Sequence, residues 1–369
     1  MSKVGISACG LRKFSQSDDS VESIMLDAVK ALFSDCPEFS KDDVDTLLVS
    51  TNDHSKYLGA IISESIGISP QTAHTVEHLC SSGTNAIVSA YSYIKSVLAN
   101  AVVVVGADKF ANPGLVLDWD LSRSQYAHPK FWASIFTHAY KEKYNITQKD
   151  SATIPVKNHK QAQQNPYAQS TTTYSIDDVL NSKSITDDLN LLDCSRSCTG
   201  SCAVLLLSEN LAKSLHQKPV WITGIGQKTH SARFTKIKDL TKPNSIISAG
   251  KSAFTMAKKD PQRIDVAEVH DAFSVFEPLI IENLGLTDYG NGMSYCQTLL
   301  DTGDNKINPR GGLLGSGHPL GATGVSQVAE ITLQLQGRAA SRQVDNPTVG
   351  LVHNMSAAAT SSTVLVLET

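Results

Sequence analysis

The alternation of short apolar runs with amphipathic helical segments is the feature that most restricts how this chain can fold. In the N-terminal half the pattern predicts strands at residues 4–7, 44–50, 75–79 and 101–105 and helices at residues 21–33, 60–66 and 82–98. The last of these strands contains four consecutive valines, Val102–Val105, as expected for a central strand that is covered on both faces. Because strands that alternate with helices form a sheet with helices on its faces, we predict an α/β fold.

A second, similar half follows. Its predicted elements are strands at residues 220–224 and 265–269, helices at 245–256, 273–284 and 325–335, and a final strand pair at 348–353 and 363–368. We therefore divide the chain into an N-terminal half, residues 1–210, and a C-terminal half, residues 211–369. Between the regular patterns, residues 110–189 contain Asn112–Pro113, Trp119, Trp132 and a polar run. We interpret this segment as an inserted loop domain; a helical excursion that supports only a dimer is the alternative.

The composition excludes several classes of protein. A chain of 369 residues with 41% apolar and 6% aromatic residues has the make-up of a globular protein with a large core. The net charge is −4 and no long basic run occurs, so nucleic-acid binding has no electrostatic support. The N-terminus enters a strand directly, and no apolar run approaches the ~20 residues that span a bilayer. We therefore expect a cytoplasmic protein without a membrane segment.

The seven cysteines do not have the spacing of a disulfide framework. Their odd number favours free thiols in a reducing compartment. Cys194, Cys198 and Cys202 are spaced four residues apart, but no matching pair of histidines accompanies them. We therefore predict no metal site.

A glycine-rich segment, residues 308–324, surrounds a single histidine, His318, with six glycines and two prolines. Glycine permits positive φ angles and a close approach of the backbone to a ligand, so the segment is suited to hold one imidazole where a helix begins. A plain helix-entry loop is the alternative, because a glycine-rich loop by itself is weak evidence of function.

Cys80 lies far upstream, where a predicted strand turns into the helix of residues 82–98. Ser81 and Ser82 are expected to cap the first turn of this helix. The unpaired N–H groups and the positive dipole end of a helix favour a thiolate, so the position predicts a lowered cysteine pKa. A buried structural cysteine is the alternative, but the Ser-Ser-Gly sequence and the glycine-framed histidine favour a nucleophile.

Four blocks of sequence together resemble the active-site blocks of thiolases. They are Cys80–Gly83, His270–Phe273, Gly317–Pro319 and the His353–Asn354 segment. The resemblance is closest to the subgroup with His-Asp-x-Phe in place of Asn-Glu-x-Phe, which comprises sterol-carrier-type thiolases and archaeal acetoacetyl-CoA thiolases. It extends over essentially the whole chain and implies a duplicated five-layered α-β-α-β-α thiolase fold, in which the inserted loop domain covers the coenzyme A site.

The resemblance also implies a role for three side chains. Cys80 would be the nucleophile that carries the acyl group as a thioester, and His318 would abstract the thiol proton. His270 would take the place of an asparagine that orients a water in an oxyanion hole. A structural role for His270 at the start of the following helix is the alternative, although Asp271 is the better helix cap.

The chain departs from the family where most thiolases carry a second cysteine as an acid–base group. Residues 350–357 contain no thiol, and the third position of the His-Asp-x-Phe block is Ala272 rather than the cysteine of some relatives. We therefore expect the α-proton of the substrate to move by way of His270, His318 or His353. The further candidates for acid–base or oxyanion support are Gly317, His353, Asn354 and Cys296.

We predict an acetyl-CoA C-acetyltransferase that interconverts two acetyl-CoA with acetoacetyl-CoA and CoA. Acyl-CoA thioesters are the expected substrates, with no tightly bound cofactor. Two alternatives are a thiolase-like aldolase acting on a β-hydroxyacyl-CoA, which needs no cysteine nucleophile, and a non-catalytic acyl-CoA-binding scaffold. The resemblance also implies a homodimer or homotetramer paired through an edge strand at residues 72–76, and a complex with a 3-hydroxy-3-methylglutaryl-CoA synthase and a small OB-fold zinc-ribbon protein.

Overall fold

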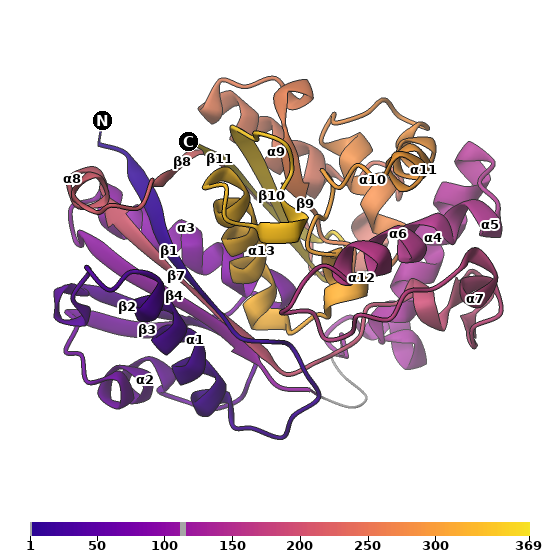
Figure 1. Cartoon of the computed structure of the whole chain (residues 1–369). Coiled ribbons are helices and arrows are strands. Elements are labelled where there is room, and N and C mark those ends of the chain that lie inside the picture. The colour runs from indigo at the N-terminus through magenta and orange to yellow at the C-terminus, as the bar shows by residue number, and fades with distance from the viewer. Residues whose placement is uncertain (1, 111–115) are drawn as a thin grey trace.

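Figure 1 shows the computed structural model of the chain, which describes residues 2–110 and 116–369. Its central element is a nine-stranded sheet with the strand order β3-β2-β4-β7-β1-β8-β11-β10-β9. The strands of this sheet are β1 Val4–Leu11, β2 Thr46–Ser50, β3 Thr72–Val76, β4 Ala101–Asp108, β7 Gly200–Ser208, β8 Val220–Thr229, β9 Val266–Glu268, β10 Val349–Ser356 and β11 Ser361–Glu368.

The sheet is built from two copies of one topology. At its centre β1 and β8 pair antiparallel, with Gly5 opposite Trp221 and Ile6 opposite Val220. Outward from this pair the order is β7, β4, β2 on one side and β11, β10, β9 on the other. The directions also agree, because β7 and β11 run antiparallel to both of their neighbours, whereas β2 and β9 run parallel to β4 and β10. The strand β3 extends the N-terminal half by one edge strand.

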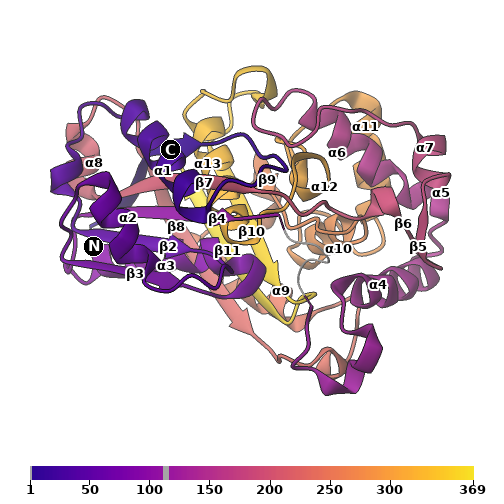
Figure 2. The same cartoon turned by 90° about the horizontal axis from the view of Figure 1, so that it is seen from below.

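Helices cover both faces of each half (Figures 1 and 2). The helices α3 and α13 pack in a shared core between the two halves, while α1 and α2 cover the opposite face of the N-terminal half and α9 and α10 that of the C-terminal half. The layers therefore run α-β-α-β-α, which confirms the predicted fold class. The helices outside the inserted segment are α1 Val21–Asp35, α2 Leu58–Ile66, α3 Ser82–Lys95, α8 Glu209–Ser214, α9 Asn244–Ala257, α10 Phe276–Asn283, α11 Gly292–Thr302, α12 Gly312–Ser316 and α13 Leu320–Leu335.

The inserted segment is more regular than its sequence indicated. Its elements are α4 Pro129–Tyr144, α5 Gln148–Ser151, α6 Thr153–Ala162, α7 Ile176–Leu180 and the strand pair β5 Ser184–Thr186 and β6 Leu189–Asn190. Trp132 and Phe136 of α4 are fully buried; Trp132 packs against Phe234 at a tilt, and Phe136 meets Phe234 and Phe276 of α10 edge to face. These aromatic contacts fix α4 on the C-terminal half. The Asn112–Pro113 pair lies outside the described residues.

Two predicted boundaries are wrong next to the candidate site. The strand predicted at residues 75–79 is β3, which ends at Val76, and the helix predicted from residue 273 is α10, which begins at Phe276. The strand ends earlier than predicted and the helix begins later, and an irregular turn takes the place of the missing residues at each position. These turns carry candidate site residues that are described below.

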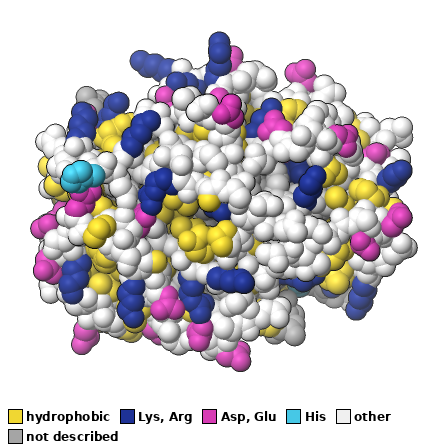
Figure 3. Space-filling model, in the orientation of Figure 1, with side chains coloured by type: hydrophobic (Ala, Val, Ile, Leu, Met, Phe, Trp, Pro, Cys, Tyr) yellow, Lys and Arg dark blue, Asp and Glu magenta, His cyan; other side chains and the backbone are white. Residues whose placement is uncertain are grey.

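On the face shown in Figure 3, basic and acidic side chains are interspersed rather than gathered into one basic field. Within the described ranges, every helix is too short or too polar to cross a bilayer.

Candidate active site

Cys80 lies in a tight turn between β3 and α3. The turn, Leu79–Ser81, is a single 3-10 turn, and Leu79 adopts a left-handed φ of 49°. A bulky residue in this region is strained, so the surrounding contacts must hold it there. The Leu79 carbonyl accepts from Asn52 Nδ2 at 3.2 Å and from Ser82 Oγ at 2.6 Å. Gly83 then lets α3 approach α13, because a Cβ at this position would lie 2.7 Å from Val325 N.

Ser81 and Ser82 do not cap α3, contrary to expectation, since neither side chain accepts from the first N–H groups of the helix. Ser81 Oγ lies 2.7 Å from Ser356 Oγ, and Ser82 Oγ accepts from His78 N at 2.7 Å. The two hydroxyls instead fasten the Cys80 turn to itself and to the end of β10. They fix the sulfur against the hairpin between β10 and β11.

His318 lies between α12 and α13, directly after Gly317, whose φ is 102°. A Cβ on Gly317 would lie 2.8 Å from Cys198 Sγ, so only glycine fits this turn. The Thr323 hydroxyl donates to Pro319 O at 2.8 Å and lies 2.7 Å from His318 Nδ1. We therefore assign the ring proton to Nδ1, which donates to Thr323 and leaves Nε2 as an acceptor.

His270 follows β9 and is buried. Its Nδ1 lies 3.0 Å from Asn354 Nδ2 of β10. The neighbouring Asp271 does not cap α10; its carboxylate accepts from Leu313 N at 2.6 Å and Leu314 N at 3.3 Å, in the first turn of α12. This residue therefore joins the His270 turn to the short helix that leads into His318.

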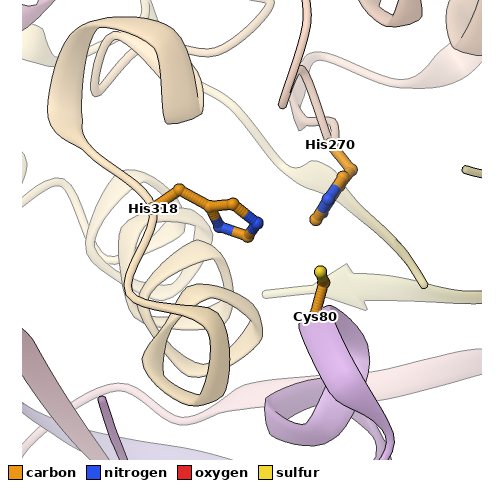
Figure 4. Close-up of side chains that lie close together, drawn as sticks. All are labelled: Cys80, His270 and His318. Carbon is orange, nitrogen blue, oxygen red and sulfur yellow. The ribbon is translucent and has the colours of Figure 1, made fainter. Parts of the chain in front are cut away.

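Figure 4 shows the three side chains converging from these separate turns. The sulfur of Cys80 and ring nitrogens of His270 and His318 all lie within 4.8 Å of one another. The two imidazole centroids are 5.1 Å apart and their planes meet at 84°. Among the described residues this trio is also the only cluster of His, Cys, Asp or Glu close enough to hold a metal ion, so Cys194, Cys198 and Cys202 form none.

The trio lies in the wall of a cavity of about 610 Å³. The cavity is bounded by side chains from both halves and from the inserted segment, which include Asn52, Asp108, His128, Ser195, Phe273, Phe276, Met355 and Ala358. A mostly apolar cavity with a few convergent polar groups is typical of a small-molecule site.

Burial dominates the electrostatics of the site. It raises the pKa of the Cys80 thiol to about 12, with a further contribution from the Asp108 carboxylate, against hydrogen bonds from the backbone N–H groups of Cys80 and Ala357. Burial, assisted by the charge of Arg310, lowers the pKa of His318 to about 3. The same cause holds the pKa of His270 well below its usual range. The resting site is therefore a neutral thiol beside two neutral imidazoles, and the pKa lowering expected from the helix start is outweighed by desolvation.

Asp108 is a buried site residue that the sequence analysis missed. Its carboxylate accepts from Thr51 Oγ1 at 3.0 Å, from Asn52 N at 2.9 Å and Asn52 Nδ2 at 3.2 Å, and from Gly321 N. Because Asn52 also holds the Leu79 carbonyl, Asp108 connects the Cys80 turn to the start of α13. The available signal was its position at the end of the four-valine strand, where side chains emerge from a sheet.

The resemblance to thiolases implies a second thiol near the turn between β10 and β11, where this chain carries alanines. Ala357, Ala358 and Ala359 adopt consecutive left-handed φ angles of 43°, 50° and 62°. Ala357 and Ala358 line the cavity. Their methyl groups make the cavity narrower than glycines at these positions would. Three consecutive alanines with left-handed φ angles also store backbone strain.

The remaining candidates, Cys296, His353, Asn354 and Gly317, do not line the cavity. Cys296 is buried in α11 and donates to Glu277 Oε1 at 3.4 Å, and it is not part of the cavity wall. His353 is fully buried in β10, and neither ring nitrogen has a hydrogen-bond partner among the described residues. Asn354 contacts His270, and Gly317 contributes only backbone.

Comparisons with known proteins agree with this architecture. Residues 5–209 match the family described as thiolase, N-terminal domain, and residues 226–369 match the one described as thiolase C-terminal domain-like. The chain is 33% identical over 313 residues to an acetyl-CoA acetyltransferase of Methanothermobacter thermautotrophicus, covering 81% of each chain. It is 34% identical over 322 residues to sterol carrier protein 2 of Homo sapiens, covering 80% of this chain and 58% of that protein.

Solved structures show the same fold. An Ltp2-ChsH2(DUF35) aldolase superposes with a TM-score of 0.86 at 23% identity, covering 99% of this chain and 97% of that chain. Human mitochondrial 3-ketoacyl-CoA thiolase in complex with CoA superposes with a TM-score of 0.76 at 17% identity, covering 100% of this chain and 98% of that chain. With both family domains matched along its length, the chain belongs to the thiolase family.

Proposed function

We propose that the protein is an acetyl-CoA C-acetyltransferase, which interconverts two acetyl-CoA with acetoacetyl-CoA and CoA through an acetyl thioester on Cys80. The observation that carries the proposal is the placement of the Cys80 sulfur within 4.8 Å of ring nitrogens of two histidines, in the wall of a large cavity. The names of two archaeal relatives, 33% and 28% identical, support the same activity.

In the first half-reaction His318 Nε2 takes the proton from the Cys80 thiol while the sulfur attacks the thioester carbon of acetyl-CoA. A carbon–sulfur bond forms to Cys80 and the bond to CoA breaks. CoA leaves as the thiol after His318 returns the proton. The backbone N–H groups of Cys80 and Ala357, which lie against the sulfur, are available to the carbonyl oxygen as negative charge develops on it.

In the second half-reaction a second acetyl-CoA loses an α-proton to a base. The resulting enolate carbon attacks the acetyl carbon on Cys80, which forms acetoacetyl-CoA and releases the Cys80 sulfur. We propose that His270 hydrogen-bonds the enolate oxygen; the closeness of its ring nitrogen to the Cys80 sulfur supports this role. We propose acyl-CoA thioesters as the substrates. The steps described here need no bound cofactor.

The test is Cys80→Ser. We expect the variant to fold but to lose both thiolysis and acetyl transfer, because a serine hydroxyl is a far weaker nucleophile near neutral pH. Mass spectrometry of the wild type mixed with acetyl-CoA should show one acetyl adduct, on Cys80. Turnover of the variant at the wild-type rate would contradict the proposal.

An aldolase that cleaves a β-hydroxyacyl-CoA is a second candidate, favoured by the lack of a second thiol among the described residues that line the cavity. It would move protons through the histidines without an acyl-cysteine. Cys80→Ala distinguishes the two functions, since it would preserve aldol cleavage and abolish acetyl transfer.

We also propose a homodimer or homotetramer that acts in the cytoplasm. Strand β3 lies at the edge of the sheet and none of its residues is fully buried, so its free side can pair with a second copy. The similar Ltp2-ChsH2(DUF35) aldolase contains a DUF35 component, which supports our proposal of a small OB-fold zinc-ribbon partner. The proposed 3-hydroxy-3-methylglutaryl-CoA synthase partner rests on the sequence resemblance alone. Co-purification of the tagged chain with each protein would test these partners.

A further inference from the structure

The hydrogen bonds behind His270 determine which of its two ring nitrogens carries the proton. Gln327 of α13 lies next to Asn354, and its Nε2 donates to His353 O at 3.3 Å. A carbonyl oxygen can only accept, so the amide nitrogen of Gln327 must face it. The amide oxygen of Gln327 therefore faces Asn354.

Asn354 is oriented in turn. Its Nδ2 lies 2.6 Å from Gln327 Oε1, an acceptor, so this atom is the NH₂ group. The same nitrogen lies 3.0 Å from His270 Nδ1, to which its second hydrogen points. A ring nitrogen that accepts this hydrogen bond carries no proton of its own. The proton of the neutral His270 ring must then be on Nε2.

Burial keeps this arrangement in place. Gln327 and Asn354 are fully buried, and His270 is 2% exposed, so water does not compete for these hydrogen bonds. Reversing one amide would set two oxygens or two N–H groups against each other in an environment of low dielectric, which is costly. Through Gln327 and Asn354, the backbone carbonyl of His353 thus determines which ring nitrogen of His270 carries the proton.

His318 has the opposite assignment. Its Nδ1–H donates to the Thr323 hydroxyl, so Nε2 is left as an acceptor. Within the trio, the two imidazoles therefore differ: His270 can only donate a hydrogen bond to the cavity, and His318 can only accept a proton from it.

We propose that Gln327 and Asn354 are positioning residues that hold His270 in the Nε2–H form, so that His318 is the one base of the trio and removes both the Cys80 proton and the substrate α-proton. This inference rests on the proposed acetyl transfer. It explains how the site functions without the second thiol that most relatives carry.

The condensation step then balances with one base. His318 Nε2 takes a proton from the methyl carbon of acetyl-CoA, and the electron pair of that C–H bond becomes the enolate. The enolate oxygen accepts the hydrogen bond from His270 Nε2–H. The enolate carbon bonds to the acetyl carbon, the carbon–sulfur bond to Cys80 breaks, and the sulfur takes the proton from His318.

The first test does not depend on turnover. In protein labelled with ¹⁵N-histidine, we expect nitrogen–proton correlations to show His270 with a bare Nδ1 and a protonated Nε2, and His318 with the reverse. The signals are assigned by their loss in His270→Gln and His318→Gln. A protonated Nδ1 on His270 in the wild type would overturn the inference, even if the enzyme proved to be an acetyltransferase.

The second test is Asn354→Asp, which replaces the donor with an acceptor of the same shape. We expect His270 Nδ1 to become protonated and condensation to slow by ~10²–10³-fold at alkaline pH, the usual loss for one oxyanion donor. Acetylation of Cys80 should remain within a few-fold of wild type. As the pH falls, His270 becomes an imidazolium and carries a proton on Nε2 again, so condensation by the variant should recover. Besides burial, the groups that lower the pKa of His270 and oppose this protonation are His318, His353 and Arg310.

Two further variants keep the result interpretable. Gln327→Leu removes the acceptor that orients Asn354, together with the donor to His353 O, but leaves Asn354 in place, and we expect a smaller loss with the same selectivity for condensation. Asn283→Asp is the matched control, because Asn283 is a buried amide whose Nδ2 donates to the carbonyls of Leu279 and Thr241. It should lose stability but leave the His270 signals unchanged. An Asn354→Asp variant that condenses at the wild-type rate at every pH would refute the positioning role. Failure of the wild type to form the acetyl adduct on Cys80 would instead refute the proposed function.

Discussion

The fraction of Cys80 that is present as a thiolate tests the electrostatics of the site most directly. Burial raises its pKa from an ordinary 9.0 to about 12. At ~1.4 kcal/mol per pKa unit, this difference amounts to ~4 kcal/mol against the thiolate. At pH 7 about one molecule in 10⁵ would carry a thiolate, compared with about one in 10² for an ordinary cysteine.

Alkylation of Cys80 by iodoacetamide, followed by peptide mass spectrometry, measures this fraction, because only the thiolate reacts. We expect the rate constant to rise about tenfold per pH unit from pH 7 to pH 10 without a plateau. At pH 7 it should be ~10³-fold below that of the same cysteine in the unfolded chain, apart from differences in access. His318→Asn is the matched variant, and it should keep the same rise of the rate constant with pH, without a plateau, because no ion pair exists to be broken. If the rate constant instead reached a plateau with a midpoint near pH 7, and the plateau disappeared in His318→Asn, Cys80 and His318 would form an ion pair. That result would refute the neutral thiol and imidazole described here.

Three further predictions follow from the site and the fold. His318→Ala should slow both Cys80 acetylation and α-proton exchange into deuterated water by ~10²–10⁴-fold, whereas His270→Ala should spare acetylation and slow condensation; burst and exchange measurements separate the two. If Cys296→Ala slowed α-proton exchange as much as His318→Ala does, that buried thiol rather than a histidine would carry the proton. Ala358→Gly should stabilise the protein by ~1 kcal/mol, seen as a higher melting temperature, because Ala358 has a φ of 50°; a lower melting temperature would show that the turn is not strained. Light scattering should give at least twice the chain mass of 39.6 kDa, and a monomer at micromolar concentration would contradict pairing through β3.

Local pattern alone located most of the elements around the site. The four valines of β4 and the apolar spacing of α1 and α9 were sufficient to predict these elements to within a few residues, because side-chain periodicity reports directly on which face is buried. The helices α4 and α6 were not predicted. Their buried residues, such as Trp132 and Phe136, pack against segments about a hundred residues or more away, which a local pattern does not reveal.

The sequence by itself singled out Cys80, His270 and His318 as candidates, because they stand in blocks that resemble those of thiolases. The tertiary structure alone decided how they behave. Desolvation raised the thiol pKa where the helix start predicted a lower one, and Asp108 and Asn354 acquired their roles through partners brought together by the pairing of β10 with β9 and the packing of α13. Elements follow from neighbouring residues, whereas protonation and hydrogen-bond direction depend on which distant groups share a space without water.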